Sequence, residues 1–185
     1  MGISNIWVFA QTTDGAASSA TLELLTKANS LGGSVTAFVA GTAGDGAAAF
    51  ADHGAAKIYE TGDLAGALPG AAVSAAMKSV IDGGDSPDLV MFPQNYEGRD
   101  VMARLSVKLN RTVITNNTDI ADSADGVVAT TPIFGGNTLV STTFTGAGPY
   151  LAAFRPKSFA AESAGGAAAA AQRQAENVIM SCRRC

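Results

Sequence analysis

The sequence predicts an α/β fold in which a mainly parallel sheet is covered by helices on both faces, with antiparallel strands in its carboxyl-terminal third. Two observations lead to this prediction. As far as about residue 115, apolar runs of roughly four to six residues alternate with longer segments of helical period, which is typical of βαβ units. Beyond Asn116 the segments become short, rich in Val and Thr, and separated by Gly-rich turns, which favours hairpins.

Five apolar segments are expected to form the parallel sheet. Each is a nearly continuous apolar run rather than an alternation of apolar and polar residues, as expected for strands that are covered on both faces. Helical segments separate these runs, so we expect neighbouring strands to be parallel. The segments fall at residues 6–10, 35–40, 57–60, 89–92 and 112–115.

Four segments between the expected strands are predicted to be crossover helices. In the first, apolar residues recur at helical spacing from Ala20 to Leu31, and Gly32-Gly33 then supplies the left-handed stop that helices favour. The same periodicity followed by glycine marks the second and third helices, and apolar spacing marks the fourth. These three are expected over residues 47–53, 71–81 and 101–109.

The carboxyl-terminal third is expected to hold three consecutive antiparallel strands joined by tight turns. Gly-Gly and Gly-Ala-Gly-Pro separate the segments at residues 126–134, 137–145 and 150–154. Beyond Phe159 the chain is rich in Ala and Gly, so residues 160–185 are interpreted as a linker or a disordered tail. One domain is therefore expected over residues 1–159.

Composition excludes several classes of partner. The 185 residues are 47% hydrophobic, enough for one core, and 12 basic against 16 acidic side chains give a net charge of −4. No run of Lys or Arg is dense enough to neutralise a phosphate backbone, so nucleic acid is not expected as a partner. No apolar stretch approaches the roughly 20 residues of a membrane span, and a soluble protein is expected.

The two ends of the chain favour a cytoplasmic location. The amino terminus enters an apolar segment without a basic leader or a cleavage site, so no export signal is expected. Both cysteines, Cys182 and Cys185, lie in the last four residues, and the fold cannot depend on a disulfide framework. A Cys-x-x-Cys pair can be redox-active or half of a zinc site, but an inert tail is the favoured interpretation because no second ligand pair follows.

Two loops are the natural places for a ligand in such a fold, because ligands bind beyond the carboxyl ends of parallel strands where the winding direction reverses. They are residues 11–15 and 93–99. The first, Gln-Thr-Thr-Asp-Gly, offers hydroxyls and a carboxylate but lacks the G-x-G-x-x-G of a dinucleotide site. Thr13 or Asp14 is expected instead to cap the first helix.

The second loop places Gly98, Arg99 and Asp100 at the expected start of the fourth helix. Asp100 suits a helix amino terminus electrostatically. Arg99 could bind a phosphate or carboxylate, or tie the loop to Glu97, to Asp14 or to a partner subunit. The structural or interface role is favoured for Gly98, Arg99, Asp100 and Asp14.

No catalytic or metal-binding group is predicted. His53 is the only histidine, and it precedes Gly54 at an expected helix end, without an identifiable nucleophile or carboxylate. Asp82, Asp85 and Asp88 lack the spacing of a calcium-binding loop and are interpreted as a solvated turn.

Eight short motifs occur in an order that resembles a known family. They are Ile6-Trp-Val-Phe-Ala10, Leu22-Glu-Leu-Leu-Thr-Lys-Ala28, Val35-Thr-Ala37, Gly54-Ala-Ala-Lys-Ile-Tyr59, Met91-Phe-Pro93, Gly98-Arg-Asp100 with Ala103-Arg-Leu105, Ile133-Phe-Gly-Gly-Asn137 and Arg155-Pro-Lys-Ser-Phe159. Over about residues 3 to 159 the chain resembles the amino-terminal domain of the alpha subunit of electron transfer flavoproteins, the family that includes the FixB proteins.

The resemblance implies an electron carrier subunit rather than an enzyme. It implies a three-layer Rossmann-like fold of the adenine nucleotide alpha hydrolase-like type. It also implies a heterodimer with a beta subunit, which carries electrons from dehydrogenases to a membrane quinone reductase or another acceptor. The carrier is FAD, held in the family chiefly by a second, carboxyl-terminal domain of the alpha subunit with segments such as Ser-Gly-Gly-Arg-Gly.

No such glycine-rich segment occurs here, so the FAD-binding domain is expected to be absent and this chain alone is not expected to bind FAD. Cofactor-binding residues cannot be assigned, while Gly98, Arg99 and Asp100 match the family's Gly-Arg-Asp motif. Three hypotheses remain: a piece or short version of the alpha subunit, a free-standing nucleotide-binding domain, and a truncated product without independent activity.

Overall fold

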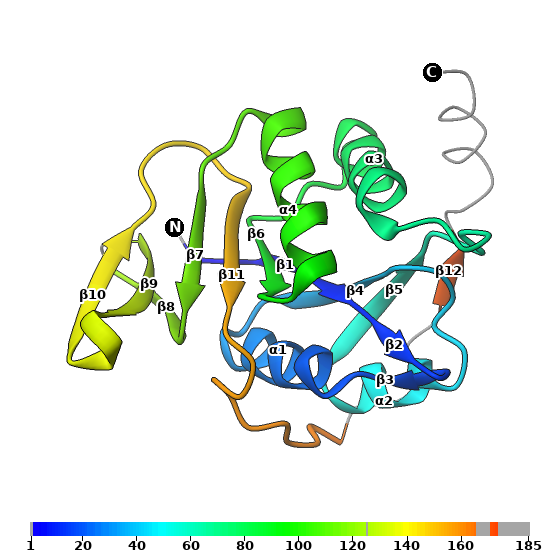
Figure 1. The fold of residues 1–185 in the computed structure, drawn as a ribbon, viewed down its shortest axis with the longest axis horizontal. Helices are drawn as coiled ribbons and strands as arrows, with labels where there is room; N and C mark the ends of the chain where they lie inside the picture. Colours follow the sequence, from blue (N-terminus) through cyan, green and yellow to red (C-terminus); the bar gives the residue numbers. More distant parts are fainter. Residues whose placement is uncertain (1, 125, 166–170, 174–185) are drawn as a thin grey trace.

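The computed structural model of the chain, which describes residues 2–124, 126–165 and 171–173, consists of a parallel sheet with helices on both faces and a smaller antiparallel sheet beside it (Figure 1). The helices are α1 (Ser19–Ser30), α2 (Gly46–Asp52), α3 (Pro69–Asp82) and α4 (Tyr96–Leu109), with the short 3-10 helix η1 (Phe134–Gly136). The strands are β1 (Asn5–Ala10), β2 (Thr12–Thr13), β3 (Ala16–Ala17), β4 (Ser34–Val39), β5 (Ala55–Glu60), β6 (Leu89–Pro93), β7 (Val113–Asn117), β8 (Asp119–Ser123), β9 (Gly126–Ile133), β10 (Thr138–Thr143), β11 (Tyr150–Phe154) and β12 (Ala171–Arg173).

The parallel sheet has the strand order β12-β5-β4-β1-β6-β11-β7, and every neighbouring pair in it is parallel. The five strands and four helices expected from the periodicity are therefore confirmed. From β1 the chain first builds β4 and β5 on one side and then crosses to β6 on the other. The winding direction thus reverses between β1 and β6, where the predicted ligand loops meet.

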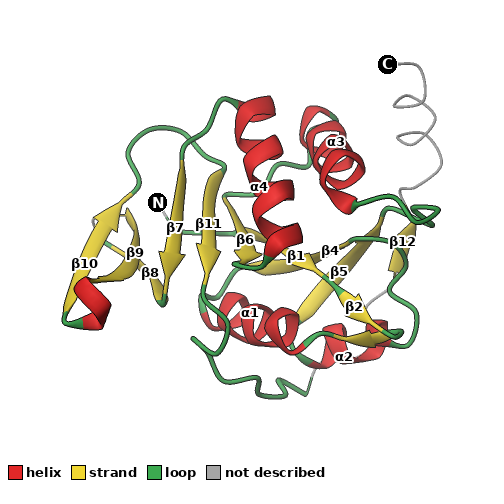
Figure 2. Cartoon of the chain, viewed as in Figure 1, coloured by secondary structure: helices red, strands yellow, loops and turns green. Residues whose placement is uncertain are grey.

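The core forms two layers because successive side chains of a strand point to opposite faces. In β1, Ile6 and Val8 pack with residues of α1 and α2, whereas Trp7 and Phe9 pack with residues of α3 and α4. None of these four side chains is exposed. Figure 2 shows the two helix pairs on opposite sides of the sheet, which confirms the three-layer α/β arrangement.

The prediction that residues 150–154 continue the antiparallel strands is wrong. β11 lies inside the parallel sheet, between β6 and β7, and pairs in parallel with both. The physical reason is visible in its composition, since Leu151, Ala152, Ala153 and Phe154 are all buried. A continuous apolar run belongs to a strand covered on both faces, not to a half-exposed hairpin.

The first helix is not capped by Thr13 or Asp14, contrary to what the sequence predicts. Thr13 and Asp14 belong to the small hairpin of β2 and β3, in which Asp14 and Gly15 have φ angles of 51° and 82°. Such an Asp-Gly pair suits a two-residue hairpin turn that needs positive φ. Ser18 caps α1 instead, because its side chain accepts a hydrogen bond from the Thr21 N–H.

β8, β9 and β10 form the antiparallel wing, which projects from the end of the parallel sheet near β7 (Figure 1). The hairpin expected over residues 126–145 is confirmed as β9 and β10. Asn117, which is fully buried, attaches the wing: its side chain donates to Ala153 O at 2.9 Å and accepts from the Thr131 hydroxyl at 2.8 Å. Lys27 of α1 also pairs with Asp119 of β8 at 2.7 Å.

Residues 155–165 run across the outer surface of α1 and α2 and are bonded to both helices. Glu23 of α1, only 9% exposed, accepts a hydrogen bond from the Lys157 N–H at 2.7 Å. Near the end of α2, Asp52 O accepts from the Ala164 N–H at 2.7 Å and its carboxylate from the Ser163 hydroxyl at the same distance. Residues 166–170 and 174–185, including both cysteines, lie outside the described residues, so most of the predicted tail stays a prediction.

Replacing Glu23 by Ala is expected to free residues 155–165 locally. The Lys157 N–H loses a charged acceptor, which lowers the local opening free energy and raises the rate of tryptic cleavage after Lys157 by about tenfold. Glu162→Ala is the matched control, because Glu162 bonds to Thr26 through its backbone groups alone among the described residues. Equal cleavage rates for the two variants, read by mass spectrometry, would contradict this role of Glu23.

Asp88 joins three strands at the amino-terminal edge of the sheet. Its Oδ2 accepts from Ser4 N at 2.8 Å, Ser4 Oγ at 2.8 Å and Asn5 N at 3.0 Å, while its carbonyl accepts from Tyr150 N. Burial alone raises the pKa of Asp88, but the donors from Ser4 and Asn5 stabilise the carboxylate and lower its pKa below 3.8. The interpretation of Asp88 as part of a solvated turn is therefore wrong.

Asp88→Asn is expected to lower the free energy of unfolding at pH 7 by about 2 kcal/mol, because the donors lose a charged acceptor. A carboxylate whose pKa is depressed on folding stabilises the fold above its unfolded pKa and loses that effect as pH falls through the folded pKa. The difference between parent and variant in denaturant unfolding should therefore be constant near neutral pH and narrow below pH 3.8. If the difference in unfolding free energy between parent and variant stayed constant into the acid range, the depressed pKa of Asp88 would be contradicted.

Candidate functional site

A groove of about 440 Å³ lies at the reversal of the sheet, between the loops that follow β1 and β6. Both loops expected to meet there do so. The amino termini of α1 and α4 also open onto it. Its lining consists of polar, hydroxyl-bearing and small residues, namely Gln11, Thr12, Thr13, Ser18, Ser19, Ala20, Asn95, Tyr96 and Glu97.

Three side chains fix the two loops to each other across this groove. Asn95 Nδ2 donates to Gln11 Oε1 at 2.6 Å, and Gln11 Nε2 donates to Glu97 Oε2. Gln11 is only 9% exposed, and its backbone N–H donates to the Thr21 hydroxyl at 2.9 Å. The groove is thus lined by polar groups that already bond to one another.

The groove does not fit the pyrophosphate of a dinucleotide. A helix amino terminus binds phosphate through free N–H groups and its positive dipole. At α1 the Ser18 side chain already accepts from Thr21 N, and at α4 the Asn95 side chain accepts from Gly98 N at 2.8 Å. The Glu97 side chain also lies in the first turn of α4, where its carboxylate would repel a phosphate.

Gly98 is required by close packing at the start of α4. The helix begins at Tyr96, so Gly98 lies in its first turn, directly over the end of β6. A Cβ atom at this position would stand 2.1 Å from Pro93 O, nearer than any van der Waals contact allows. The residue type is therefore dictated by the approach of helix and strand.

Asp100 does not lie at the start of α4, as the sequence predicts, but one turn inside the helix. Its Oδ1 accepts from Arg104 Nε at 2.7 Å, an (i, i+4) pair on the surface of α4. Its carboxylate also faces Gly70 of α3, where an added Cβ would lie 1.8 Å from Oδ2. Asp100 thus contributes to the contact between α3 and α4.

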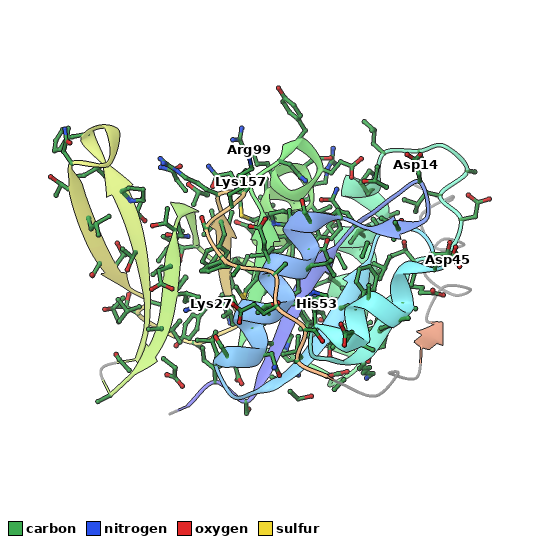
Figure 3. All side chains as sticks on the ribbon, turned by 90° about the horizontal axis from the view of Figure 1, so that it is seen from below. Asp14, Lys27, Asp45, His53, Arg99 and Lys157 are labelled. Atoms are coloured by element: carbon green, nitrogen blue, oxygen red, sulfur yellow. The ribbon has the colours of Figure 1, made fainter. Side chains whose placement is uncertain are left out.

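Arg99 and Asp14 have no such structural contact within the described part of the chain. Both side chains are exposed, and neither forms an ion pair or a side-chain hydrogen bond with a described residue. Figure 3 shows Asp14 well separated from Arg99, so the expected tie between them is not formed. Arg99 is therefore the residue of the Gly-Arg-Asp motif that remains available to a partner.

Two clusters of polar residues have structural explanations. Burial and the hydrogen bond to Asp85 raise the pKa of Tyr59, whose hydroxyl donates to Asp85 Oδ2 at 2.5 Å. Lys57 also pairs with Asp85 at 2.8 Å, so Asp85 is not a solvated turn residue. His53 ends α2, as predicted, with Nδ1 at 2.8 Å from Ala49 O.

Over the described ranges, no three acidic, His or Cys side chains gather in a way that could hold a metal ion. Within the same ranges, no helix is long and apolar enough to cross a membrane.

Comparison with known proteins supports the resemblance stated above. Residues 6–179 match the model of the electron transfer flavoprotein domain. The electron transfer flavoprotein subunit alpha of Syntrophomonas wolfei subsp. wolfei (strain DSM 2245B / Goettingen) is 31% identical over 157 residues, covering 83% of this chain and 49% of the relative. Protein FixB of Clostridium saccharobutylicum is 28% identical over 162 residues, covering 83% and 48%. The chain thus spans about half the length of the curated relatives it matches.

Proposed function

Because the chain belongs to the electron transfer flavoprotein family, we propose that it is the docking half of an alpha subunit, which assembles with a beta subunit to support FAD-mediated electron transfer. The family match covers nearly the whole described chain, while the relatives are about twice as long. The proposed role is assembly rather than chemistry. In this role electrons pass from dehydrogenases to an acceptor through the complete complex and not through this chain alone.

The observation that carries the proposal is the exposed edge of the antiparallel wing. β10 pairs with β9 and has no other neighbouring strand among the described residues. Phe134, Leu139 and Val140 there are 77%, 64% and 37% exposed. Residues 126–154 contain no charged side chain, so nothing on β10 protects its edge from pairing with another strand.

An uncharged, partly apolar edge strand of this kind suits a partner that adds an extended segment to the sheet and covers the apolar side chains. In the proposed complex that partner is the beta subunit. Gly98 and Asp100 hold α4 in place within the chain, and Arg99 stays exposed to a partner.

FAD, in this proposal, is held outside the described part of the chain. The groove between β1 and β6 contains the Glu97 carboxylate, and a side chain caps each of the two helix amino termini that open onto it. The purified chain is therefore expected to be colourless after mixing with FAD and removal of unbound flavin. A retained flavin spectrum in stoichiometric amount would overturn this part of the proposal.

The test of assembly is the mass of a mixture of this chain with an electron transfer flavoprotein beta subunit, measured by light scattering. A one-to-one complex is expected at about 10 μM, since stable heterodimers have dissociation constants at or below the micromolar range. Two separate species at this concentration would overturn the proposal.

A second candidate function, a free-standing nucleotide-binding domain, is suggested by the position of the groove at the reversal of the sheet, although the Glu97 carboxylate in its lining disfavours phosphate. Calorimetric titration with AMP, ATP and FAD distinguishes it. Saturable binding that is lost in Gln11→Ala would support a nucleotide site, whereas flat titrations would remove this candidate.

A further inference from the structure

A group of cationic side chains lies at the carboxyl-terminal edge of the sheet without acidic partners in the described structure. Four of the described Lys and Arg side chains pair with a carboxylate: Lys27, Lys57, Lys78 and Arg104. Five do not: Arg99, Lys108, Arg111, Arg155 and Lys157. Three of these five, Arg99, Arg155 and Lys157, come from neighbouring segments of the fold.

Strand register brings Arg155 to the loop that precedes α4 and Arg99, and Lys157 follows Arg155 by two residues. Phe154 pairs with Pro93, and Gln94 N donates to Phe154 O at 2.8 Å, so Arg155 begins beside the loop that leads into α4. Arg99 lies in the first turns of that helix. In Figure 1 the beginning of α4 lies beside the lower ends of β6 and β11.

The backbone and polar neighbours hold two of these cations in position. Arg155 Nε donates to Asn116 Oδ1 at 2.6 Å, and its backbone N–H donates to Asn117 O at 2.9 Å. The Lys157 N–H is held by Glu23. These bonds orient Arg155 and Lys157 but neutralise neither charge.

Of three acidic side chains near this edge, two bond to neutral donors and keep their charge, and the third is in an ion pair. Glu23 accepts the Lys157 N–H, Glu97 accepts from Gln11, and Asp100 pairs with Arg104. All three cations are exposed, on a chain whose net charge is −4. Three exposed cations therefore face solvent beside two less exposed carboxylates, Glu23 and Glu97, and this leaves a local excess of positive charge that favours an acidic partner.

We propose that Arg99, Arg155 and Lys157 form a cationic rim that receives an acidic surface of the beta subunit. The inference rests on the proposed function and names the charge chemistry of the same partner. Exposed charges at the edge of an interface act mainly on the association rate and on its salt dependence. The rim thus orients the approaching subunit, while the apolar wing supplies contact area.

The test compares single charge reversals in the full chain by surface plasmon resonance with a beta subunit. Arg155→Glu and Lys157→Glu are each expected to lower the association rate about tenfold at about 50 mM salt, with the difference shrinking toward about 500 mM as screening increases. The matched control is Lys108→Glu, which makes the same charge change on an exposed side chain at the far end of α4. The Lys157 side chain has no bond to a described residue, so its reversal removes no such bond, and a thermal melt verifies that each variant is folded.

Each possible result of this experiment supports or overturns the cationic rim. The rim is supported if both rim variants associate more slowly than the parent in a salt-sensitive way, while Lys108→Glu associates at the rate of the parent. Rim variants that associate like the parent would overturn it and leave the heterodimer standing. Equal slowing by Lys108→Glu would show a net-charge effect and also overturn it. If the parent chain does not bind the beta subunit, the proposed function fails and the rim fails with it.

Discussion

Gly98→Ala is expected to lower the free energy of unfolding by about 3 kcal/mol or more, the upper range for overpacking a buried position. The added Cβ would meet Pro93 O at 2.1 Å, and that oxygen belongs to a backbone fixed in the sheet. Relief requires the first turn of α4 to move away from β6. The shift would also break the Asn95 cap and the Asn95–Gln11 bond across the groove.

Gly70→Ala is the matched control for Gly98→Ala. There the added Cβ meets the end of the Asp100 side chain, which can rotate away and give up an exposed ion pair worth less than about 1 kcal/mol. Its denaturant midpoint should lie near that of the parent, while that of Gly98→Ala falls far below it. Comparable midpoints for the two variants would show that the close approach at Gly98 does not dictate the residue type.

Leu139→Lys is expected to weaken the complex with the beta subunit at least about 30-fold, the cost of losing one central apolar contact of an interface. A lysine places a charge on an edge strand whose neighbourhood contains none, and this blocks strand addition. Leu139 is 64% exposed, so the fold itself should change by less than about 0.5 kcal/mol. Calorimetric titration measures the dissociation constant.

Leu68→Lys is the control for Leu139→Lys. Leu68, 77% exposed, precedes α3 on the side of the molecule away from β10 (Figure 1). The same chemical change there should leave the dissociation constant unaltered. If both variants bind like the parent, the wing is not the contact surface.

The parallel core could be predicted from the sequence because burial on both faces leaves a strong local signal. Continuous apolar runs such as those of β1 and β6, separated by helical periods that end in glycine, have few other interpretations. The place of β11 could not be predicted in the same way. Its apolar run is local, but its insertion between β6 and β7 depends on strand pairing between distant residues.

The candidate site was predicted in location but not in detail. Both loops at the reversal of the sheet were expected, since topology alone places them there. The hydrogen bond between Gln11 and Glu97 joins residues far apart in the sequence, so no local sequence pattern predicts it. The Asp14-Gly15 hairpin did have a local signal, the Asp-Gly pair, which was interpreted as a helix cap. Arg155 and Lys157 belong to the Arg155-Pro-Lys-Ser-Phe159 motif, but the place of Arg155 beside the loop before α4 follows from the register of β11.

The central claim, that this chain docks a beta subunit through its antiparallel wing, is tested most directly by amide hydrogen exchange in the presence and absence of that subunit. Addition of a strand to β10 would bond backbone N–H groups that face solvent in the free chain. The account predicts slowed exchange within residues 138–143, with the amides of α3 unchanged. Unchanged exchange in residues 138–143, in a complex whose formation light scattering has verified, would contradict it.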